Sequence, residues 1–468
     1  MSANAQAVAE RVAAPIHKEQ RFDWPLCYEA EKLVLEKLAA FTSRNGFART
    51  LEQSMRDRTG TLLLDWVDHV VLSREDLPAL LEAGYIEEQI GETRQVYVHP
   101  EAMLPRVIVD PTVRADKSPS VVALKVDSIS DFAMVHRILG EPEGAPMSRF
   151  RKLVVFAEQD ATLEVIERRG YRGYEPGRHE PGKLEVILRA HELWKTRQRV
   201  FADDTDGFRS THALIDRIVG MVGQNMACHI VFAEERAYWQ SRNRAGQVQK
   251  SRQDKLGLGW ANHDHHTFRN SRQHFVQLMQ ALEKLGFERR ERYYAGSEAG
   301  WGAQILEQPV EGIVTFCDVD LEPEETHIDF SRKPLPPSKR LGTIGLWVGL
   351  HGESLLDAGM HHLECRFDHE LLREQLASAN VNTMKPFSDF PFLKQAFTEG
   401  ERWPVRPERV ERLLRAKLIT QEQADKFLQE GAIGSHLENL QRKGGFKGFN
   451  QKSVSVIIEA TDPRNQGH

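Results

Sequence analysis

The sequence predicts an α+β fold in which β-α-β-β-β modules follow one another in tandem, with added helices. Two short histidine-bearing stretches, one around His265 and one around His362, are each followed by a helical pattern and then by further strands. A related βα pattern recurs earlier in the chain and indicates divergent repeats of one supersecondary unit. The length of 468 residues exceeds what one ordinary core serves and agrees with several modules.

We divide the chain into five regions by composition and pattern. They are a helical N-terminal segment (1–57), a divergent βαββ-type region (58–200), a helical and polar linker (201–258), a first metal-site module (259–330) and a second metal-site module (340–468) with a helical insertion (392–440). A proline-rich bridge at 333–337 separates the two metal-site modules.

The region 58–200 contains the weaker copies of the pattern. Residues 62–72 are rich in β-branched and aliphatic side chains and predict a strand, which a short helix and two further strands follow. Similar βα starts recur at 121–126 and 153–157. The third unit is expected to continue with a helix near 163–166 and a strand at 184–188. In the linker, residues 239–255 have almost no apolar side chains and predict a solvated loop.

His69 is a candidate metal ligand because it opens a strand directly after Asp68. No arginine lies four residues further on, and no acidic strand partner is evident downstream. The favoured interpretation is therefore a structural histidine.

Composition argues against several classes of function. The formal net charge is −6, whereas a general nucleic-acid-binding protein presents a basic face. No long apolar run predicts a membrane span, and the N-terminus has no apolar signal region. The four cysteines form no C-x-x-C pair and fit a reducing compartment. We expect a cytoplasmic protein that binds no nucleic acid and no membrane; the sequence does not predict its oligomeric state.

The first metal-site module begins with a strand of sequence HHTFR at 265–269. Alternation along a strand places His265, Thr267 and Arg269 on one face and His266 on the other. An imidazole and a guanidinium on one face suit a divalent metal with an anion bound beside it. A helix at 271–285 and strands at 291–294, 301–306 and 312–317 complete the expected module.

The second metal-site module repeats this spacing. Arg366 follows His362 by four residues, as Arg269 follows His265. Asp368 is an N-cap candidate for the helix that follows. The chain closes on a strand at 453–461, in which Glu459 is an acid in an otherwise apolar strand. Such an acid is costly unless it is paired or bound to metal.

Two histidines and one carboxylate can form a facial triad that leaves positions on Fe(II) open for substrate and O₂. We predict His265, His362 and Glu459 as the metal ligands and Fe(II) as the cofactor. His361 could replace His362 as the ligand, although strand phase favours His362. Asp264, His266 and His361 are expected in supporting positions behind the ligands, with Asp264 orienting a ligand histidine.

This order of two histidines and a glutamate resembles the vicinal-oxygen-chelate superfamily. More narrowly, residues 264–269 (DHHTFR) resemble the D-H-x-[AT]-[FI]-R motif of the iron-dependent 2-oxoadipate dioxygenase/decarboxylase family, and residues 361–366 (HHLECR) are similar to its N-H-[LV]-T-x-R motif. The resemblance covers about 260–464. The chain departs from the family at His361 and Glu364, where the family has Asn and Thr, and in its long N-terminal extension.

The resemblance implies a dioxygenase and decarboxylase that converts a 2-oxo acid similar to 2-oxoadipate into a 2-hydroxy acid, an activity associated with lysine catabolism. Its small-molecule partners would be the 2-oxo acid, which is its own reductant, and O₂. The resemblance implies that Arg269 is the catalytic residue that binds a substrate carboxylate. Arg366 is a second candidate for substrate binding. The alternatives are a metal-dependent hydrolase or isomerase on the same fold and a catalytically inactive binding protein.

Overall fold

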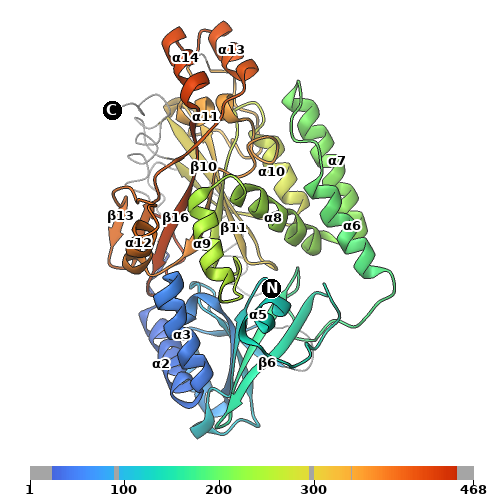
Figure 1. Ribbon diagram of the computed structural model, residues 1–468, viewed down its shortest axis with the longest axis vertical. Helices are drawn as coiled ribbons and strands as arrows, with labels where there is room; N and C mark the ends of the chain where they lie inside the picture. Colours follow the sequence, from blue (N-terminus) through green and yellow to red (C-terminus); the bar gives the residue numbers. More distant parts are fainter. Residues whose placement is uncertain (1–23, 89–93, 295–299, 339, 451–468) are drawn as a thin grey trace.

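The computed structural model describes residues 24–88, 94–294, 300–338 and 340–450. They form two mixed β-sheets with helices packed around them, which confirms the predicted α+β class (Figure 1). In this view the seven-stranded sheet lies at the bottom and the nine-stranded sheet lies above it. None of the helices in the described part of the chain has the length and apolar character that a membrane crossing requires.

The nine-stranded sheet contains both histidine-bearing modules. The first comprises β8 (His263–Arg269), α10 (Phe275–Lys284), β9 (Glu288–Tyr294), β10 (Trp301–Gln308) and β11 (Ile313–Asp320). The second comprises β12 (His362–Arg366), α12 (His369–Ala377), β13 (Ser388–Phe390), β14 (Leu393–Phe397), β15 (Glu401–Trp403) and β16 (Ala432–Arg442). β8 pairs in parallel with β11, and β12 pairs in parallel with β16. The two modules meet where β8 and β12 pair antiparallel.

The seven-stranded sheet follows the same plan. Its elements are β1 (Val67–Ser73), α4 (Leu77–Glu82), β2 (Ile86–Glu88), β3 (Gln95–Val98) and β4 (Arg106–Asp110), then β5 (Val121–Lys125), α5 (Ile129–His136), β6 (Phe150–Glu158) and β7 (Ala161–Arg168). β1 pairs in parallel with β4 and antiparallel with β5, and β5 pairs in parallel with β7. Both sheets therefore have the tandem-module topology of the vicinal-oxygen-chelate fold.

Two elements beside the seven-stranded sheet differ from the types that their sequence predicts. The segment expected to be a helix near 163–166 is β7, because it pairs with both β5 and β6 and these cross-strand contacts decide its conformation. The segment expected to be a strand at 184–188 lies in α6 (Lys183–Lys195). The side chains that α6 buries recur at helical spacing: Ile187, Ala190 and Trp194.

The polar linker is helical throughout much of its length, as α7 (Asp204–Val222), α8 (Gln224–Gln240) and α9 (Arg244–Asp254). The prediction of a solvated loop at 239–255 is wrong, since Gln249 and Gln253 have no exposed surface. The Nε2 group of Gln249 donates to the carbonyl of Thr59 at 2.8 Å and to Oε1 of Gln253 at 2.9 Å. Paired amides can be buried without the hydropathy signal that marks a core helix.

Of these helices, α9 lies near the junction of the two sheets in Figure 1, whereas α7 lies to the right of the nine-stranded sheet. The helices α2 (Tyr28–Arg44) and α3 (Gly46–Thr59) cover the seven-stranded sheet, and α9 contacts both α3 and β16. The two sheets are thus joined through packed helices and also by direct contacts, such as the hydrogen bond that Arg366 donates to the carbonyl of Asp65.

The predicted helical insertion at 392–440 is helical only in its middle, and its bounds are corrected accordingly. The helices are α13 (Pro407–Arg415) and α14 (Gln421–Glu430), which pack with α11 (Thr343–His351) into a small core at the top of Figure 1. The flanking residues belong to β14, β15 and β16. Strand β16 lies inside the sheet between β12 and β14, and most of its side chains are buried. A strand buried on both faces lacks the alternation that reveals a strand in a sequence.

A buried ion cluster fixes α8 to its neighbours. Glu235 has no exposed surface and accepts hydrogen bonds at 2.8 Å from Arg197, from Arg199 and from Nε1 of Trp194. Both arginines also donate to carbonyls at 355 and 356, ahead of β12. Burial alone would raise the pKa of Glu235, but the two guanidinium groups outweigh it and lower the pKa to about 2.

We expect Glu235→Gln to lower the free energy of unfolding at pH 7 by about 3 kcal/mol, because it leaves two buried guanidinium groups without their carboxylate. The folded-state pKa of Glu235 lies below its ordinary value of 4.5, so this contribution is complete above pH 4.5 and is lost as the pH falls toward 2. Denaturant unfolding at a series of pH values should therefore show a flatter acid limb in the variant. Glu234→Gln, at the adjacent position, is the control, and an unchanged acid limb in Glu235→Gln would contradict the assignment.

Candidate metal centre

Three metal-ligating side chains form a row across the middle of the nine-stranded sheet. His265 on β8 is opposite Glu364 on β12, and Glu364 is opposite Glu438 on β16. Residues directly opposed on neighbouring strands point to the same face of a sheet. One ligand atom of each side chain lies within 4.8 Å of one from each of the others, and all three residues are buried.

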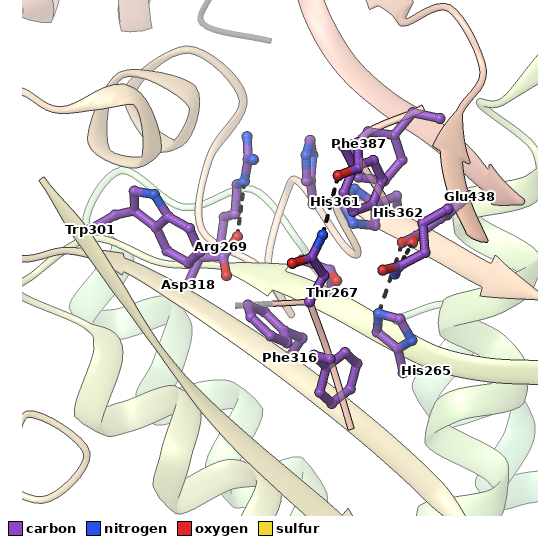
Figure 2. A pocket seen from close by; sticks show the side chains of 14 residues that line it. His265, Thr267, Arg269, Trp301, Phe316, Asp318, His361, His362, Phe387 and Glu438 are labelled. Atoms are coloured by element: carbon purple, nitrogen blue, oxygen red, sulfur yellow. Dashed lines mark hydrogen bonds and ion pairs between the residues drawn. The ribbon is translucent and has the colours of Figure 1, made fainter. Parts of the chain in front are cut away.

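His362 stands one pleat away, opposite Thr267 on β8. Its Nε2 lies 2.6 Å from Oε1 of Glu364, and Nε2 of His265 lies 3.5 Å from the same oxygen. The distance from Nε2 of His265 to Oε2 of Glu438 is 3.9 Å. Figure 2 shows His265, His362 and Glu438 turned toward one space. Two imidazoles and two carboxylates thus meet on one face of the sheet.

A buried ion pair orients His265. Its Nδ1 lies 3.0 Å from Oδ1 of Asp264, so the ring presents Nε2 to the other side chains of the row. Arg442, the last residue of β16, donates to both carboxylate oxygens of Asp264 at 3.0 Å. Burial alone would raise the pKa of Asp264, but Arg442 and His265 hold it well below its usual range. The contact fixes the orientation of the imidazole of His265, and a role of Asp264 toward a metal stays a prediction.

The donor set fits a divalent cation. Burial, followed by repulsion from Glu438, raises the pKa of Glu364 well above its ordinary value, and burial likewise raises the pKa of Glu438. Burial lowers the pKa of His265 and of His362, which favours the neutral imidazoles that bind metals. Within the described residues, Oε2 of Glu364 and Nδ1 of His362 are buried without a hydrogen-bond partner. A cation would neutralise the adjacent carboxylates and engage unpartnered atoms of this kind.

Arg269 and Asp318 lie toward the other end of the same cavity, beside Trp301 (Figure 2). Nε of Arg269 lies 3.4 Å from Oδ2 of Asp318, and the two residues are directly opposed on β8 and β11. Burial raises the pKa of Asp318 to about 7, although Arg269 acts against this rise. On one face of the sheet, the cavity therefore has one end with side chains that suit a metal (His265, His362 and Glu438), here called the metal-type end. The other end has a guanidinium that suits an anion (Arg269), here called the anion-type end.

The walls between these ends are aromatic, with Phe316 and Phe397 among the lining side chains. The cavity volume is about 60 Å³, so this is a small cavity.

The other site residues that the sequence predicts fall in separate places. His361 lines the cavity, but its Nδ1 lies 3.0 Å from the carbonyl of Gly434 and its ring packs against Trp347. His266 packs against Phe232 of α8, on the opposite face of the sheet from His265. The supporting roles of His361 and His266 stay predictions. Glu459 lies outside the described residues.

The prediction that Arg366 shares in substrate binding is corrected. Arg366 is not among the residues that line the cavity, and it donates to the carbonyl of Asp65 at 2.9 Å. Arg366 keeps the phase of His362 along β12, because the pairing of β12 with β16 is unbroken, but it is the last residue of that strand and lies four residues beyond His362. A count of four residues along a strand does not reveal which part of the strand lies at the cavity.

Glu438 escapes prediction because the expected helical insertion (392–440) covers most of β16, and Arg442 lies just beyond that insertion. The signal that favoured Glu459, an acid within an apolar strand, applies equally to Glu438, which stands between Leu437 and Asn439-Leu440. Glu364 is visible in the sequence only as a departure from the family motif. In the structure, Glu364 is the middle residue of the row, between His265 and Glu438.

The seven-stranded sheet repeats half of this arrangement. His69 is opposite Ala123, and Ala123 is opposite Glu164, which are the positions of His265, Glu364 and Glu438 in the larger sheet. Nδ1 of His69 lies 2.8 Å from Oδ2 of Asp68. Arg168, the last residue of β7, donates to both oxygens of Asp68 at 2.9 and 2.8 Å, as Arg442 does to Asp264.

The seven-stranded sheet has no imidazole at the position that His362 occupies in the nine-stranded sheet. By the same register, Val121 occupies the position of His362. Nζ of Lys152 lies 3.2 Å from Oε1 of Glu164, so an ammonium group supplies positive charge to the carboxylate that corresponds to Glu438. His69 is therefore a structural histidine in this sheet, in agreement with the interpretation favoured by its sequence context.

No protein-family model matches the chain, and no curated protein matches it. The chain is similar to several solved structures. A mutant of 4-hydroxymandelate synthase from Streptomyces coelicolor is 13% identical, and the match covers 86% of this chain and 99% of that chain with a TM-score of 0.26. Methylmalonyl-CoA epimerase from Mycobacterium tuberculosis is 12% identical, and the match covers 39% of this chain and 88% of that chain with a TM-score of 0.23. The uncharacterised protein YdcJ from Shigella flexneri, which includes domain DUF1338, is 12% identical, and the match covers 51% of this chain and 73% of that chain with a TM-score of 0.23. Similarities this low assign no activity.

We expect Asp264→Asn to lower metal affinity by roughly 10- to 100-fold, because the amide orients His265 less well and leaves Arg442 without its carboxylate. Metal analysis of protein purified without chelator, followed by titration of the chelated protein with Fe(II), measures the effect. Asp68→Asn is a matched control, since it breaks the corresponding ion pair in the sheet that has one imidazole. Equal loss of metal in both variants would show that the effect is general destabilisation.

Proposed function

We propose that the protein is a non-haem Fe(II)-dependent oxygenase that oxidatively decarboxylates a 2-oxo acid to a 2-hydroxy acid. The observation that carries the proposal is the meeting of His265, His362 and Glu438 in a cavity that Arg269 also lines. Two imidazoles and one carboxylate leave adjacent positions open on Fe(II), which is the ligand set of many Fe(II) oxygenases. A guanidinium in the same cavity suits an acidic substrate.

We assign the metal to His265, His362 and Glu438. Glu438 takes the role that the sequence favoured for Glu459, because the register of β12 with its two neighbours brings it into the row of His265. Nε2 of Gln395 donates to Oε1 of Glu438 at 2.7 Å, which leaves Oε2 for the metal. When bound, Fe(II) supplies the positions at which the 2-oxo acid and O₂ meet and the route by which electrons pass between them.

Glu364 adds a second carboxylate beside these three ligands. The hydroxyl of Thr267 donates to its Oε1 at 2.7 Å, and its Oε2 has no partner among the described residues. The family that the motifs resemble has threonine at this position. The additional negative charge favours retention of a cation, and it also opposes the approach of a second anion. We therefore expect Glu364 to influence which acids the cavity accepts.

Arg269 is the group that we assign to the substrate carboxylate. Its guanidinium is buried, belongs to the same strand face as His265 and can hold a carboxylate in bidentate geometry. Because burial raises the pKa of Asp318 to about 7, this neighbour is partly protonated near neutral pH and competes less strongly for Arg269. The rings of Phe316 and Phe397 restrict water in the space between.

The reaction balances without a further reductant. One 2-oxo acid and one O₂ give one CO₂ and one 2-hydroxy acid that is shorter by one carbon. The bond between the carboxyl and keto carbons breaks, and both atoms of O₂ enter the product, one in its carboxylate and one in its hydroxyl group. The electrons that reduce O₂ come from the substrate itself.

We expect protein loaded anaerobically with Fe(II) to consume O₂ and release CO₂ in equal amounts with at least one member of a panel of 2-oxo acids of increasing chain length. An oxygen electrode and capture of labelled CO₂ measure the two quantities. Turnover that persists without O₂ would indicate a metal-dependent hydrolase or isomerase instead. Metal binding without turnover of any acid would favour a binding protein.

We expect Arg269→Lys to lower kcat/KM by roughly 10- to 100-fold, mainly through KM, because lysine keeps the charge but not the two parallel hydrogen bonds. Iron content should remain that of the unaltered protein. Arg332→Lys is the control, since Arg332 is exposed and pairs with Asp329 away from the cavity. Loss of iron together with loss of activity would show that Arg269 is needed for the fold of the site rather than for substrate binding.

A further inference from the structure

A second and larger cavity lies between the two sheets. It encloses about 490 Å³ and is lined by the ends of β5 and β7, by one face of α8 and by the segment that leads into β8. Pockets of this volume accommodate small organic ligands and often lie between structural units. The cavity shares no lining residue with the metal centre, so it is a separate candidate site.

Helix α8 gives the cavity both its space and its polarity. Ala233 and Ala237 line it with small side chains, and His229, Arg236 and Gln240 line it at neighbouring helical positions. Because this face of α8 is polar, the cavity cannot be closed by apolar packing. It suits a ligand that carries charge and hydrogen-bonding groups.

The charges that line the cavity do not balance. Six lining side chains are basic and three are acidic. All three acids are already engaged: Glu167 pairs with Arg151 at 3.1 Å and with Arg169 at 2.8 Å, Glu311 pairs with His229 at 3.1 Å, and Asp127 accepts a hydrogen bond from the amide of Trp260 at 2.6 Å. Positive charge therefore remains uncompensated.

The uncompensated charge lies on Arg236 and Lys125. Arg236 is only 8% exposed, and its Nη1 is buried without a hydrogen-bond partner in the described part of the chain. Neither side chain forms an ion pair with any described carboxylate. Burial lowers the pKa of Lys125, and Arg168 and Arg236 lower it further, while Glu311 and Asp68 act in the opposite direction. Two cations that repel each other in a partly buried space are costly unless an anion lies between them.

Two further lining residues offer unpartnered atoms. Nε1 of Trp260 and Nε2 of His191 are buried without a hydrogen-bond partner among the described residues. The indole N–H can only donate, so it adds a neutral donor beside the two cations. Donors from α8, from β5 and from the segment before β8 thus converge on one volume, as they do in sites for oxyanions.

We propose that this cavity binds a small organic anion, whose carboxylate or phosphate group is held by Arg236 and Lys125. Arg236 supplies the planar fork that matches an oxyanion, and Lys125 supplies a point charge. Trp260 and His263 line the cavity, and His263 begins β8 two residues before His265. A bound anion would therefore contact the segment that leads directly into the metal centre.

Isothermal titration calorimetry on the metal-free, full-length protein tests this site, with inorganic phosphate and glutarate as the two probes. We expect saturable binding of at least one probe, and the stronger probe identifies the group that the natural ligand carries. Arg236→Gln should weaken that binding by about 10- to 100-fold. Lys250→Gln is the matched control, because Lys250 also lines the cavity but is paired with Asp254 at 2.7 Å, and it should change affinity by less than about twofold.

Two additional variants make the outcome decisive. Arg269→Lys should leave binding unchanged, which separates this cavity from the anion-type end of the metal centre. If thermal melting shows that Arg236→Gln does not fold, the half-buried Lys125→Gln takes its place. The proposal is overturned if neither probe binds saturably up to about 10 mM, or if the affinity is the same in the unaltered protein, Arg236→Gln and Lys125→Gln.

Discussion

The register in which β8, β12 and β16 pair is the constraint on which the candidate metal centre depends. His265, Glu364 and Glu438 come from three strands, and they share one face only in this register. A slip of one residue in any strand would turn its member of the row to the opposite face. The ion pair between Asp264 and Arg442 links β8 to β16 across the intervening strand, so it supports the register and orients an imidazole through the same carboxylate.

Comparison of the two sheets shows that the contact of a histidine with an aspartate and an arginine occurs with and without a second imidazole. The smaller sheet keeps the histidine, its aspartate and the arginine that binds the aspartate, although it has Val121 where the larger sheet has His362. The aspartate–arginine pair is thus compatible with a sheet that has one imidazole, and its contribution there is to strand register. In the larger sheet the same pair sits behind a second imidazole and two carboxylates, where ligand orientation becomes a further consequence of a contact that already stabilises the fold.

The sequence predicts those parts of the molecule whose periodicity is strong. The strands of His265 and His362 and the position of Arg269 could be predicted because alternation and repeated spacing reveal which residues share a face. Glu438 could not, because β16 is buried on both faces and its residues do not alternate. Helix α9 could not be predicted either, because buried amide side chains stand where a core helix usually has apolar ones. The contact of Arg366 with the carbonyl of Asp65 joins residues 301 positions apart, and a single sequence does not encode such a contact locally.

The meeting of the two modules at β8 and β12 has a consequence for the order in which the protein is made. Synthesis proceeds from the N-terminus, and units of a long chain generally fold in that order. The seven-stranded sheet is complete once β7 has left the ribosome, whereas β8 emerges with His265 long before β16 supplies Glu438. A nascent chain therefore cannot bring the three side chains of the row together until β16 has been translated. Any cation that the row binds would be captured only after the aromatic side chains that line the cavity, such as Phe316 and Phe397, are present.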